Sequence, residues 1–373
     1  MENTDPAVAE FDGWLTELME GHGSDLHVKV GSPPMVRLPD GLRRMNRDPL
    51  TPVETAAIAE SIIPHDRRES FDRNGEVDFA YSLKDVGRFR ANVFKQRGSI
   101  SMVLRRLRFG GPTFEEMGLP DAVRELANEH RGLILVTGPT GSGKTTTLAS
   151  MIGFINETKP VHIVTIEDPI EVLHRDAVAS INQREVGNDT QDFLSALRAA
   201  LRQDPDVILI GEMRDEETVR TALSAAETGH LVLSTVHTLD ATETINRLVD
   251  FFPPHLQHQA RVMLAATLKG AIAQRLVPDV SGDGRVPASE VLVVTGRVQD
   301  LILNPDETGK ITEVIAEGEY YGMRTFDQSL LGYVMEGKIS EETALDYASS
   351  PHDFKLMLAA GGQRASGIEQ LAS

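Results

Sequence analysis

The chain has 373 residues, of which 40% are hydrophobic and 25% charged, and this length predicts two domains, each with its own core. Its 56 acidic and 37 basic residues give a formal charge of −19, so its surface repels phosphate backbones and nucleic acid is not expected as a partner. Because the chain contains no cysteine, disulfides, cysteine nucleophiles and cysteine metal ligands are excluded.

The N-terminal residues lack the basic start and the apolar stretch of a signal peptide. No window approaches the ~18 uninterrupted apolar residues of a membrane-spanning helix. We therefore expect a cytoplasmic protein without direct membrane insertion, held at the inner face of the cell membrane only through partners.

Residues 1–112 are predicted to form a smaller α+β domain. Alternating apolar residues predict short strands within 26–38 and again within 77–107. Between these regions a helix opens at Thr51-Pro52. The turn-forming residues Gly110-Gly111-Pro112 then close the domain.

Residues 113–348 alternate apolar runs with helical segments, which predicts a mostly parallel sheet covered by helices. A long amphipathic helix or helix pair is expected over 255–276, followed by a smaller appendix of helices and strands. The region 349–373 is predicted to be a C-terminal tail. The expected core strands are 133–137, 161–166, 207–210 and 231–235.

The segment GPTGSGKT matches the phosphate-binding pattern G-x-x-x-x-G-K-[ST] in full and lies between a predicted strand and a predicted helix. At such a turn, backbone N–H groups and the helix N-terminus surround a phosphate. Lys144 would reach the β- and γ-phosphates of ATP, and Thr145 would ligate Mg²⁺. The expected nucleotide-binding residues are Gly138, Pro139, Thr140, Gly141, Ser142, Gly143, Lys144, Thr145 and Thr146.

Acidic residues follow two other predicted strands. Glu212 comes after the apolar run 207–210, where it could hold a Mg²⁺-bound water or polarise the attacking water. Glu167, Asp168 and Glu171 follow the strand 161–166, and three carboxylates so close together favour a shared cation. We predict Glu171 as the general base, with Glu167 and Asp168 near the metal; a helix N-terminal acidic cluster is the alternative.

Two histidines flank the predicted strand 231–235. His237 lies at its carboxyl end, beside the inferred phosphate site, and is predicted to sense the γ-phosphate. His230 lies at the other end, where a structural hydrogen bond is the more common role.

The region 81–108 contains eight basic residues and one acidic residue, a local charge of +7 in an acidic chain. This pattern is compatible with a solvated basic hairpin, with a nucleic-acid stripe, and with arginines presented to the nucleotide of a neighbouring subunit. We favour the third interpretation.

Four segments, in this order, resemble the secretion-ATPase superfamily, whose members drive type IV pili and type II secretion. GPTGSGKTT is similar to its Walker A box, TIEDPIE to its Asp box, LRQDPDVILIGEMRD to its Walker B signature and AAETGHLVLSTVHT to its His box. SDLHVKVGSPPMVRL, RFRANVF and MVLRRL extend the resemblance through the first domain. The short N-terminal region, without a tetracysteine zinc insert, resembles the pilus-retraction (PilT) type.

The resemblance implies a PAS-like α+β domain, a RecA-like P-loop NTPase core and a helical C-terminal appendix. It also implies a homo-hexameric motor that hydrolyses ATP with Mg²⁺ and drives pilus retraction in twitching motility, together with an inner-membrane pilus platform protein. Glu171 and Glu212 would be its catalytic acids, with Thr145 and Glu212 at the metal. Arg90 and Arg105, with Arg88 beside them, would complete the site of a neighbouring subunit.

The sequence departs from the retraction type at residues 297–302, where RVQDLI replaces AIRNLI and only Leu301 and Ile302 are kept. We predict that these two residues belong to a coupling surface separate from the catalytic site. A pilus-assembly or type II secretion ATPase is the alternative function. A nucleic-acid translocase is disfavoured by the net charge, and an inert paralogue by the presence of Lys144, Glu171 and Glu212.

Overall fold

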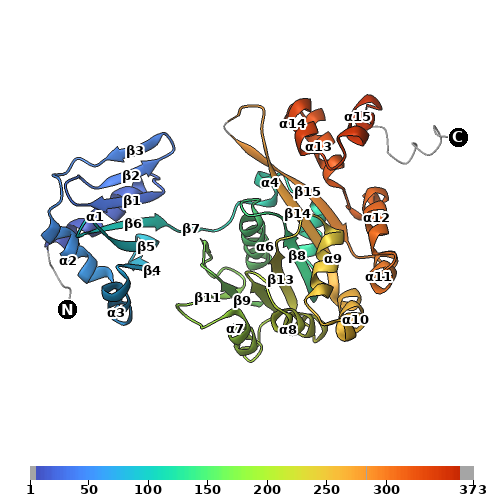
Figure 1. Ribbon diagram of the computed structural model, residues 1–373, viewed down its shortest axis with the longest axis horizontal. Helices are drawn as coiled ribbons and strands as arrows, with labels where there is room; N and C mark the ends of the chain where they lie inside the picture. The colour runs from blue at the N-terminus through green and yellow to red at the C-terminus, as the bar shows by residue number, and fades with distance from the viewer. Residues whose placement is uncertain (1–5, 283, 362–373) are drawn as a thin grey trace. The chain divides into compact units, whose positions relative to one another are not determined.

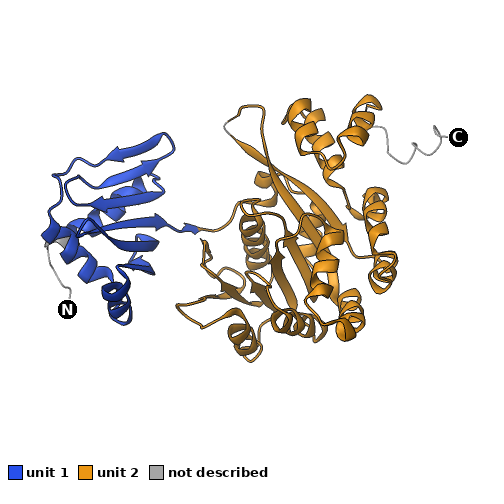
Figure 2. Cartoon of the chain, in the orientation of Figure 1, with its two compact units in different colours: residues 1–108 blue, residues 109–373 orange. Residues whose placement is uncertain are grey.

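The computed structural model describes residues 6–282 and 284–361, which divide into two compact units between Arg108 and Phe109 (Figure 2). The first unit is built on a six-stranded antiparallel sheet with the order β3-β2-β1-β6-β5-β4. Its strands are β1 (Asp25–Lys29), β2 (Met35–Leu38), β3 (Gly41–Arg44), β4 (Glu76–Leu83), β5 (Gly87–Gln96) and β6 (Ser99–Arg106), and its helices are α1 (Pro6–Glu20), α2 (Pro52–Ile62) and α3 (His65–Asn74).

Hydrogen bonds between neighbouring residues and the alternation of apolar side chains explain where these elements form. Helix α2 begins where the sequence predicts, because Thr51 and Glu54 form a capping box in which each side chain accepts a hydrogen bond from the other residue's backbone N–H. In the sheet, Leu26 and Val28 are buried in the core of the unit, whereas His27 between them lies on the other face.

The second unit, which begins in the short strand β7 (Arg108–Phe109), contains a seven-stranded sheet with the order β11-β9-β12-β13-β8-β14-β15. All of these strands are parallel except β15 at one edge. The strands of the unit are β8 (Gly132–Thr137), β9 (His162–Glu167), β10 (Val172–Leu173), β11 (Ser180–Glu185), β12 (Val207–Ile210), β13 (Leu231–Val236), β14 (Leu268–Pro278) and β15 (Arg285–Val293). The four core strands predicted from the sequence correspond to β8, β9, β12 and β13.

Helices cover both faces of this sheet (Figure 1). They are α4 (Phe114–Met117), α5 (Asp121–Ala127), α6 (Lys144–Thr158), α7 (Phe193–Ala200), α8 (Glu216–Glu227), α9 (Ala241–Asp250), α10 (Gln257–Thr267), α11 (Gly296–Leu303), α12 (Ile311–Glu317), α13 (Phe326–Met335), α14 (Glu341–Tyr347) and α15 (Pro351–Ala359). The predicted α/β class, with an N-terminal α+β unit, a core with a mostly parallel sheet and a helical end, is confirmed.

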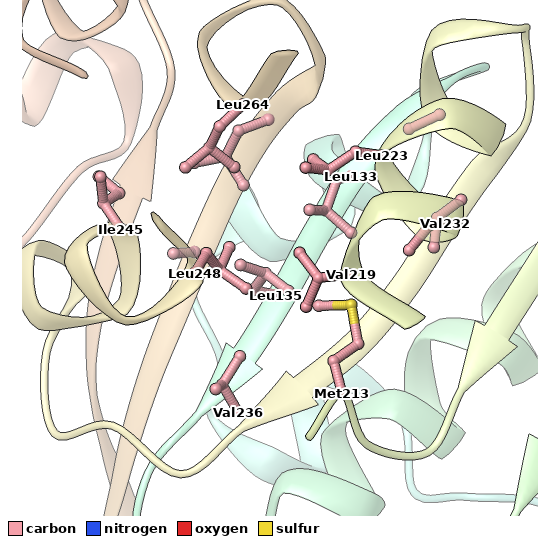
Figure 3. Close-up of a cluster of buried hydrophobic side chains, with 14 of the residues drawn as sticks. Leu133, Leu135, Met213, Val219, Leu223, Val232, Val236, Ile245, Leu248 and Leu264 are labelled. Carbon is pink, nitrogen blue, oxygen red and sulfur yellow. The ribbon is translucent and has the colours of Figure 1, made fainter. Parts of the chain in front are cut away.

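Strand β8 shows how the two faces are filled. Leu133 and Leu135 point into one hydrophobic cluster with side chains of α8, α9 and α10, and Figure 3 shows this cluster closing around them. Ile134 and Val136 point the other way, into a second cluster that includes residues of α5 and α6. Because both faces of β8 are covered, its sequence is apolar throughout rather than alternating.

The long helix predicted over 255–276 is wrong in its second half. Helix α10 ends at Thr267, and the following residues form β14, which pairs with β8 on one side and β15 on the other. A strand buried on both faces has the same continuous apolar character as a buried helix, so periodicity does not separate the two. Gly270 lets β14 pack closely against α5, since a Cβ atom at that position would lie 2.7 Å from the side chain of Leu126.

The predicted tail also begins too early. Residues 351–359 form helix α15, and its Phe354 is fully buried in a small cluster with residues of α13 and α14. Residues 362–373 lie outside the described part of the chain. Among the described residues no helix is both long and apolar enough to cross a membrane.

Candidate active site

The glycine-rich segment forms a loop between β8, which ends at Thr137, and α6, which begins at Lys144. Gly138 has a φ of 138°, and a Cβ atom there would lie 2.3 Å from the backbone oxygen of Gln274. The loop can therefore approach β14 this closely only with glycine. Nζ of Lys144 donates to the carbonyl oxygens of Gly138 (2.9 Å) and Pro139 (3.0 Å), so the lysine lies across the mouth of the loop.

The carboxyl ends of four neighbouring strands deliver the other predicted groups to the same edge of the sheet. In the spatial order β9-β12-β13-β8 these ends carry, respectively, the Glu167–Glu171 segment, Glu212, His237 and the phosphate-binding loop. Ligands of open parallel sheets lie at this edge. Gly211 is fixed between its neighbours, because its N–H donates to Ile166 and its carbonyl accepts from the hydroxyl of Thr235.

Lys144, His237 and Glu212 form one hydrogen-bonded chain. Nζ of Lys144 lies 3.5 Å from Nδ1 of His237, and Nε2 of His237 lies 3.2 Å from Oε1 of Glu212. The other carboxylate oxygen of Glu212 accepts from Nη2 of Arg214 at 2.7 Å. With the lysine donating to Nδ1, the histidine carries its proton on Nε2 and donates it to the glutamate.

Burial and neighbouring charges shift the pKa values of Lys144 and Glu212 in opposite directions. Burial lowers the pKa of Lys144, although the charge of Glu212 opposes the shift. Burial would raise the pKa of Glu212, but hydrogen bonds and positive charge from Arg214 and His237 outweigh burial and hold that pKa below its usual value. Glu212 is therefore an ionised carboxylate whose side chain is only 18% exposed.

The three acids at the carboxyl end of β9, Glu167, Asp168 and Glu171, all line the cavity described below. Oε1 of Glu167 accepts hydrogen bonds from the hydroxyl of Thr165 (2.7 Å) and from Nε2 of Gln183 (3.1 Å), and burial raises its pKa. Within 6–282 and 284–361, no group of three or more histidines and acids is arranged to hold a metal ion. The side chain of Glu167 is thus held by internal polar partners, and the placing of Glu167 and Asp168 near a metal stays a prediction. Glu171, in contrast, is exposed.

A cavity of about 580 Å³ connects these groups. It is lined by residues of the phosphate-binding loop together with Thr145, Glu171, Glu212 and His237. His174 also lines it and was not predicted; burial lowers its pKa to about 4, so it is a neutral group at physiological pH.

A second cavity, of about 540 Å³, adjoins the first at the loop, since Gly143, Thr146 and Leu276 line both. Gln274, which is fully buried, lines this second cavity and was also not predicted. Its Oε1 accepts from the hydroxyl of Thr147 at 2.8 Å, whereas its Nε2 has no hydrogen-bond partner among the described residues. No local motif marks Gln274, because Thr147, which donates to its side chain, is 127 residues away in sequence.

The two histidines around β13 have different surroundings. Nδ1 of His230 lies 2.9 Å from the carbonyl oxygen of Ala225, at the end of the strand opposite to the cavity. This contact matches the structural role considered for His230. His237 lines the cavity.

The predicted arginines lie in the first unit. Arg90 on β5 and Arg105 on β6 are direct cross-strand partners and are exposed. Nε of Arg105 donates to Oδ1 of Asp25 at 2.8 Å, and Nε of Arg90 lies 3.8 Å from Oδ1 of Asp78. Nε of Arg88 is buried and has no hydrogen-bond partner within the part of the chain that the structure describes.

Comparisons with known proteins show the family of the chain. Residues 91–344 match the family described as type II/IV secretion system protein. The type IV pilus retraction ATPase PilT of Pseudomonas aeruginosa is 44% identical over 344 residues, which cover 91% of this chain and 99% of that protein. The type IV pilus ATPase PilU of the same organism is 40% identical, covering 98% of this chain and 94% of that protein.

Among solved structures, the crystal structure of the pilus retraction motor PilT with bound ADP superimposes with a TM-score of 0.83 at 47% identity, covering 93% of this chain and 99% of that one. The family model spans well over half of the chain, and the resemblance first seen in four short segments extends across both units. The chain therefore belongs to the type II/IV secretion system protein family, among its PilT-like members.

Proposed function

We propose that the chain is the motor ATPase of a type IV pilus, which hydrolyses ATP to drive pilus retraction. The observation that carries this proposal is the chain Lys144–His237–Glu212 at the phosphate-binding loop. This hydrogen-bonded chain links a phosphate-binding lysine to an ionised carboxylate through a histidine. A site that responds to the γ-phosphate requires such a link. Similarity to PilT along nearly the whole chain supports pilus retraction as the output.

The phosphates of ATP lie at the loop, with Lys144 on the β- and γ-phosphates. The nucleoside extends into the second cavity, where the unpartnered amide of Gln274 can donate a hydrogen bond to it. Among the residues at the cavity, the hydroxyl of Thr145 and the carboxylate of Glu212 supply oxygen atoms of the kind that Mg²⁺ prefers. Mg²⁺ bound there would neutralise phosphate charge.

Glu171 acts as the general base in this proposal. Its exposed carboxylate lines the cavity, on the strand end that neighbours that of Glu212. A water attacks the γ-phosphorus, the bond between that phosphorus and the ADP oxygen breaks, and the proton of the water passes to Glu171. His237, which contacts both Lys144 and Glu212, couples the binding of the γ-phosphate to the position of Glu212.

Arg90 and Arg105 complete the site of a neighbouring subunit in a homo-hexamer, where their guanidinium groups stabilise the charge of the transferred phosphoryl group. A closed ring gives every subunit such a neighbour. The ring works in the cytoplasm at the inner membrane, docked on a pilus platform protein.

The chemistry is tested with purified protein carrying Lys144→Ala, Glu171→Gln or Glu212→Gln. Lys144→Ala should lose tight ATP binding, while both glutamate variants should keep it and lose turnover by ~10²-fold or more. Glu227→Gln is the matched control, because Glu227 is an exposed glutamate at the end of α8. Near-normal hydrolysis in both glutamate variants would refute the proposed site.

The direction of work is tested by deleting the gene. Loss of a retraction motor leaves cells piliated but unable to retract, whereas loss of an assembly motor leaves cells without pili. Pilus counts and single-pilus retraction events in the deletion strain therefore separate retraction from assembly. Bald cells would favour the assembly ATPase.

A further inference from the structure

A row of charged residues crosses the sheet of the first unit. Asp25 on β1 is the direct cross-strand partner of Arg37 on β2 and of Arg105 on β6, and Arg105 is in turn the partner of Arg90 on β5. Direct antiparallel partners share a face of the sheet. Since Leu26 and its partner Leu104 are fully buried in the core, this row lies on the face opposite to the core.

Asp25 is held much more firmly than an ordinary surface carboxylate. Its side chain is 6% exposed, and both of its oxygens are occupied, Oδ1 by Nε of Arg105 (2.8 Å) and Oδ2 by the hydroxyl of Ser24 (2.8 Å). Burial would raise its pKa, but these hydrogen bonds and the charge of Arg105 outweigh burial and lower it. The aspartate is therefore an ionised, immobilised acceptor.

The partner arginine is bound at one end only. The side chain of Arg105 is 71% exposed, and its contact with Asp25 uses Nε. The two terminal nitrogens have no hydrogen bond to other described residues, so they remain able to form the paired hydrogen bonds by which a guanidinium binds a phosphate. An arginine fixed in this way loses less side-chain entropy on binding an anion.

Arg90 gives the contrast on the same face. Its Nε lies 3.8 Å from Asp78, and both side chains of this pair are about half exposed. Such an exposed ion pair contributes little free energy and does not fix either side chain. The row thus contains one arginine held by a buried carboxylate and one that is free to move.

We propose that Asp25 is a positioning residue for ATP hydrolysis: it fixes Arg105 through Nε and leaves the terminal nitrogens aimed at the γ-phosphate bound by a neighbouring subunit. This inference rests on the proposed role of Arg105 in trans. Asp25 itself touches no reacting atom and acts only through Arg105.

The test is a double-mutant cycle on the full-length protein, with kcat and KM for ATP measured for Asp25→Ala, Arg105→Ala and the double variant. Each single variant should lower kcat by about tenfold or more with KM changed by less than about threefold. The double variant should be no slower than Arg105→Ala, because Asp25 has no other route to the site. Asp25→Asn, which keeps an acceptor for Nε, should restore part of the rate. If the alanine variant does not fold, Asp25→Asn is measured in its place, with a smaller loss of kcat expected and again no further loss in combination with Arg105→Ala.

Mixed rings add a readout that a purely structural role would not give. Asp25→Ala subunits mixed with Lys144→Ala subunits should regain ATPase activity, because some interfaces then join an intact loop to a correctly held arginine. A mixture of Glu212→Gln with Lys144→Ala subunits should not regain activity. Both substitutions damage the nucleotide-binding side of an interface, so no interface in the mixed ring has an intact one. Glu17→Ala, which breaks an exposed ion pair with Arg47 in the same unit, is the control for unspecific damage and should stay within about twofold of wild type.

Two results would overturn the inference and are distinguishable from failure of the proposed function. If Arg105→Ala is slow but folded Asp25→Ala is as fast as wild type, or if the two losses multiply in the double variant, Asp25 does not act through Arg105. If Arg105→Ala itself hydrolyses ATP normally, the proposed role of Arg105 is refuted. The inference about Asp25 is then refuted as well.

Discussion

Nε2 of His237 lies 3.2 Å from Oε1 of Glu212, which places the histidine between the carboxylate and the lysine of the phosphate-binding loop. These residues follow two neighbouring strands, β13 and β12, so their contact depends on the pairing of those strands. In the proposed function, this contact is the route by which a movement of Lys144 on phosphate binding would alter the position of Glu212. This relationship makes His237 the connecting group of the site.

We expect His237→Ala to lower kcat by about tenfold to a hundredfold while changing the affinity for ATP by less than about threefold, because Lys144 and the loop backbone remain. Steady-state ATPase assays and equilibrium binding of a labelled nucleotide measure the two quantities. His230→Ala is the matched control, since His230 lies at the other end of the same strand and its ring nitrogen Nδ1 lies within hydrogen-bond distance of Thr228 and Ala225 of its own turn. Equal losses in both variants would contradict the role of His237.

Gly138→Ala should weaken nucleotide binding by about tenfold or more and lower the melting temperature. The added Cβ atom would lie 2.3 Å from the backbone oxygen of Gln274, so the loop must move away from β14. Gly141→Ala provides the comparison: its φ of 79° is also unfavourable for alanine, but no atom lies within 4 Å of the added Cβ. The difference between the two variants therefore measures the steric contact, and equal effects would show that backbone strain alone matters.

Leu301 and Ile302, predicted to belong to a coupling surface, are not on the surface of this unit, because Ile302 is fully buried and Leu301 is 8% exposed in the main core. Ile302→Ala should instead destabilise the fold by about 2–5 kcal/mol. Gln299→Ala with Asp300→Ala, on the exposed side of the same helix, should change stability by less than about 0.5 kcal/mol each. Denaturant unfolding measures both. If α11 contributes to output, the exposed pair should impair pilus retraction with ATPase activity preserved.

Glu290 should make stability depend on pH. Burial and the charges of Asp240 and Asp327 raise its pKa to about 7, against the opposing hydrogen bond from the N–H of Ala241 and the charge of Arg275. The folded state therefore holds a proton that the unfolded state releases near its ordinary value of 4.5, so stability falls as pH rises from about 4.5 to 7 and stays lower above that.

Glu290→Gln should remove this dependence and raise the free energy of unfolding at pH 8 by at most about 3 kcal/mol, because the amide is neutral and its oxygen can still accept from Ala241. Melting temperatures of wild type and variant between pH 5 and pH 8.5 measure the effect. The two curves should converge towards pH 5. A constant difference across the range would show that the charge of Glu290 is not the cause.

Sequence by itself determined the parts of this protein that depend on contiguous residues. The loop from Gly138 to Thr145 follows from its glycines and its position between an apolar strand and a helix. The strands β8, β9, β12 and β13 follow from short apolar runs, and the capped start of α2 follows from Thr51. In each case a short run of residue types is enough to predict the local element, although distant segments complete its packing.

Only the tertiary structure decided which of these groups meet. It held Glu167 through hydrogen bonds from Thr165 and Gln183, and made 268–278 a strand rather than a helix. It also buried Ile302 and placed Asp25 against Arg105, a partner 80 residues away. The physical reason is common to all four: burial and hydrogen bonding between distant segments outweigh local preference, and those contacts exist only once strands pair and helices pack.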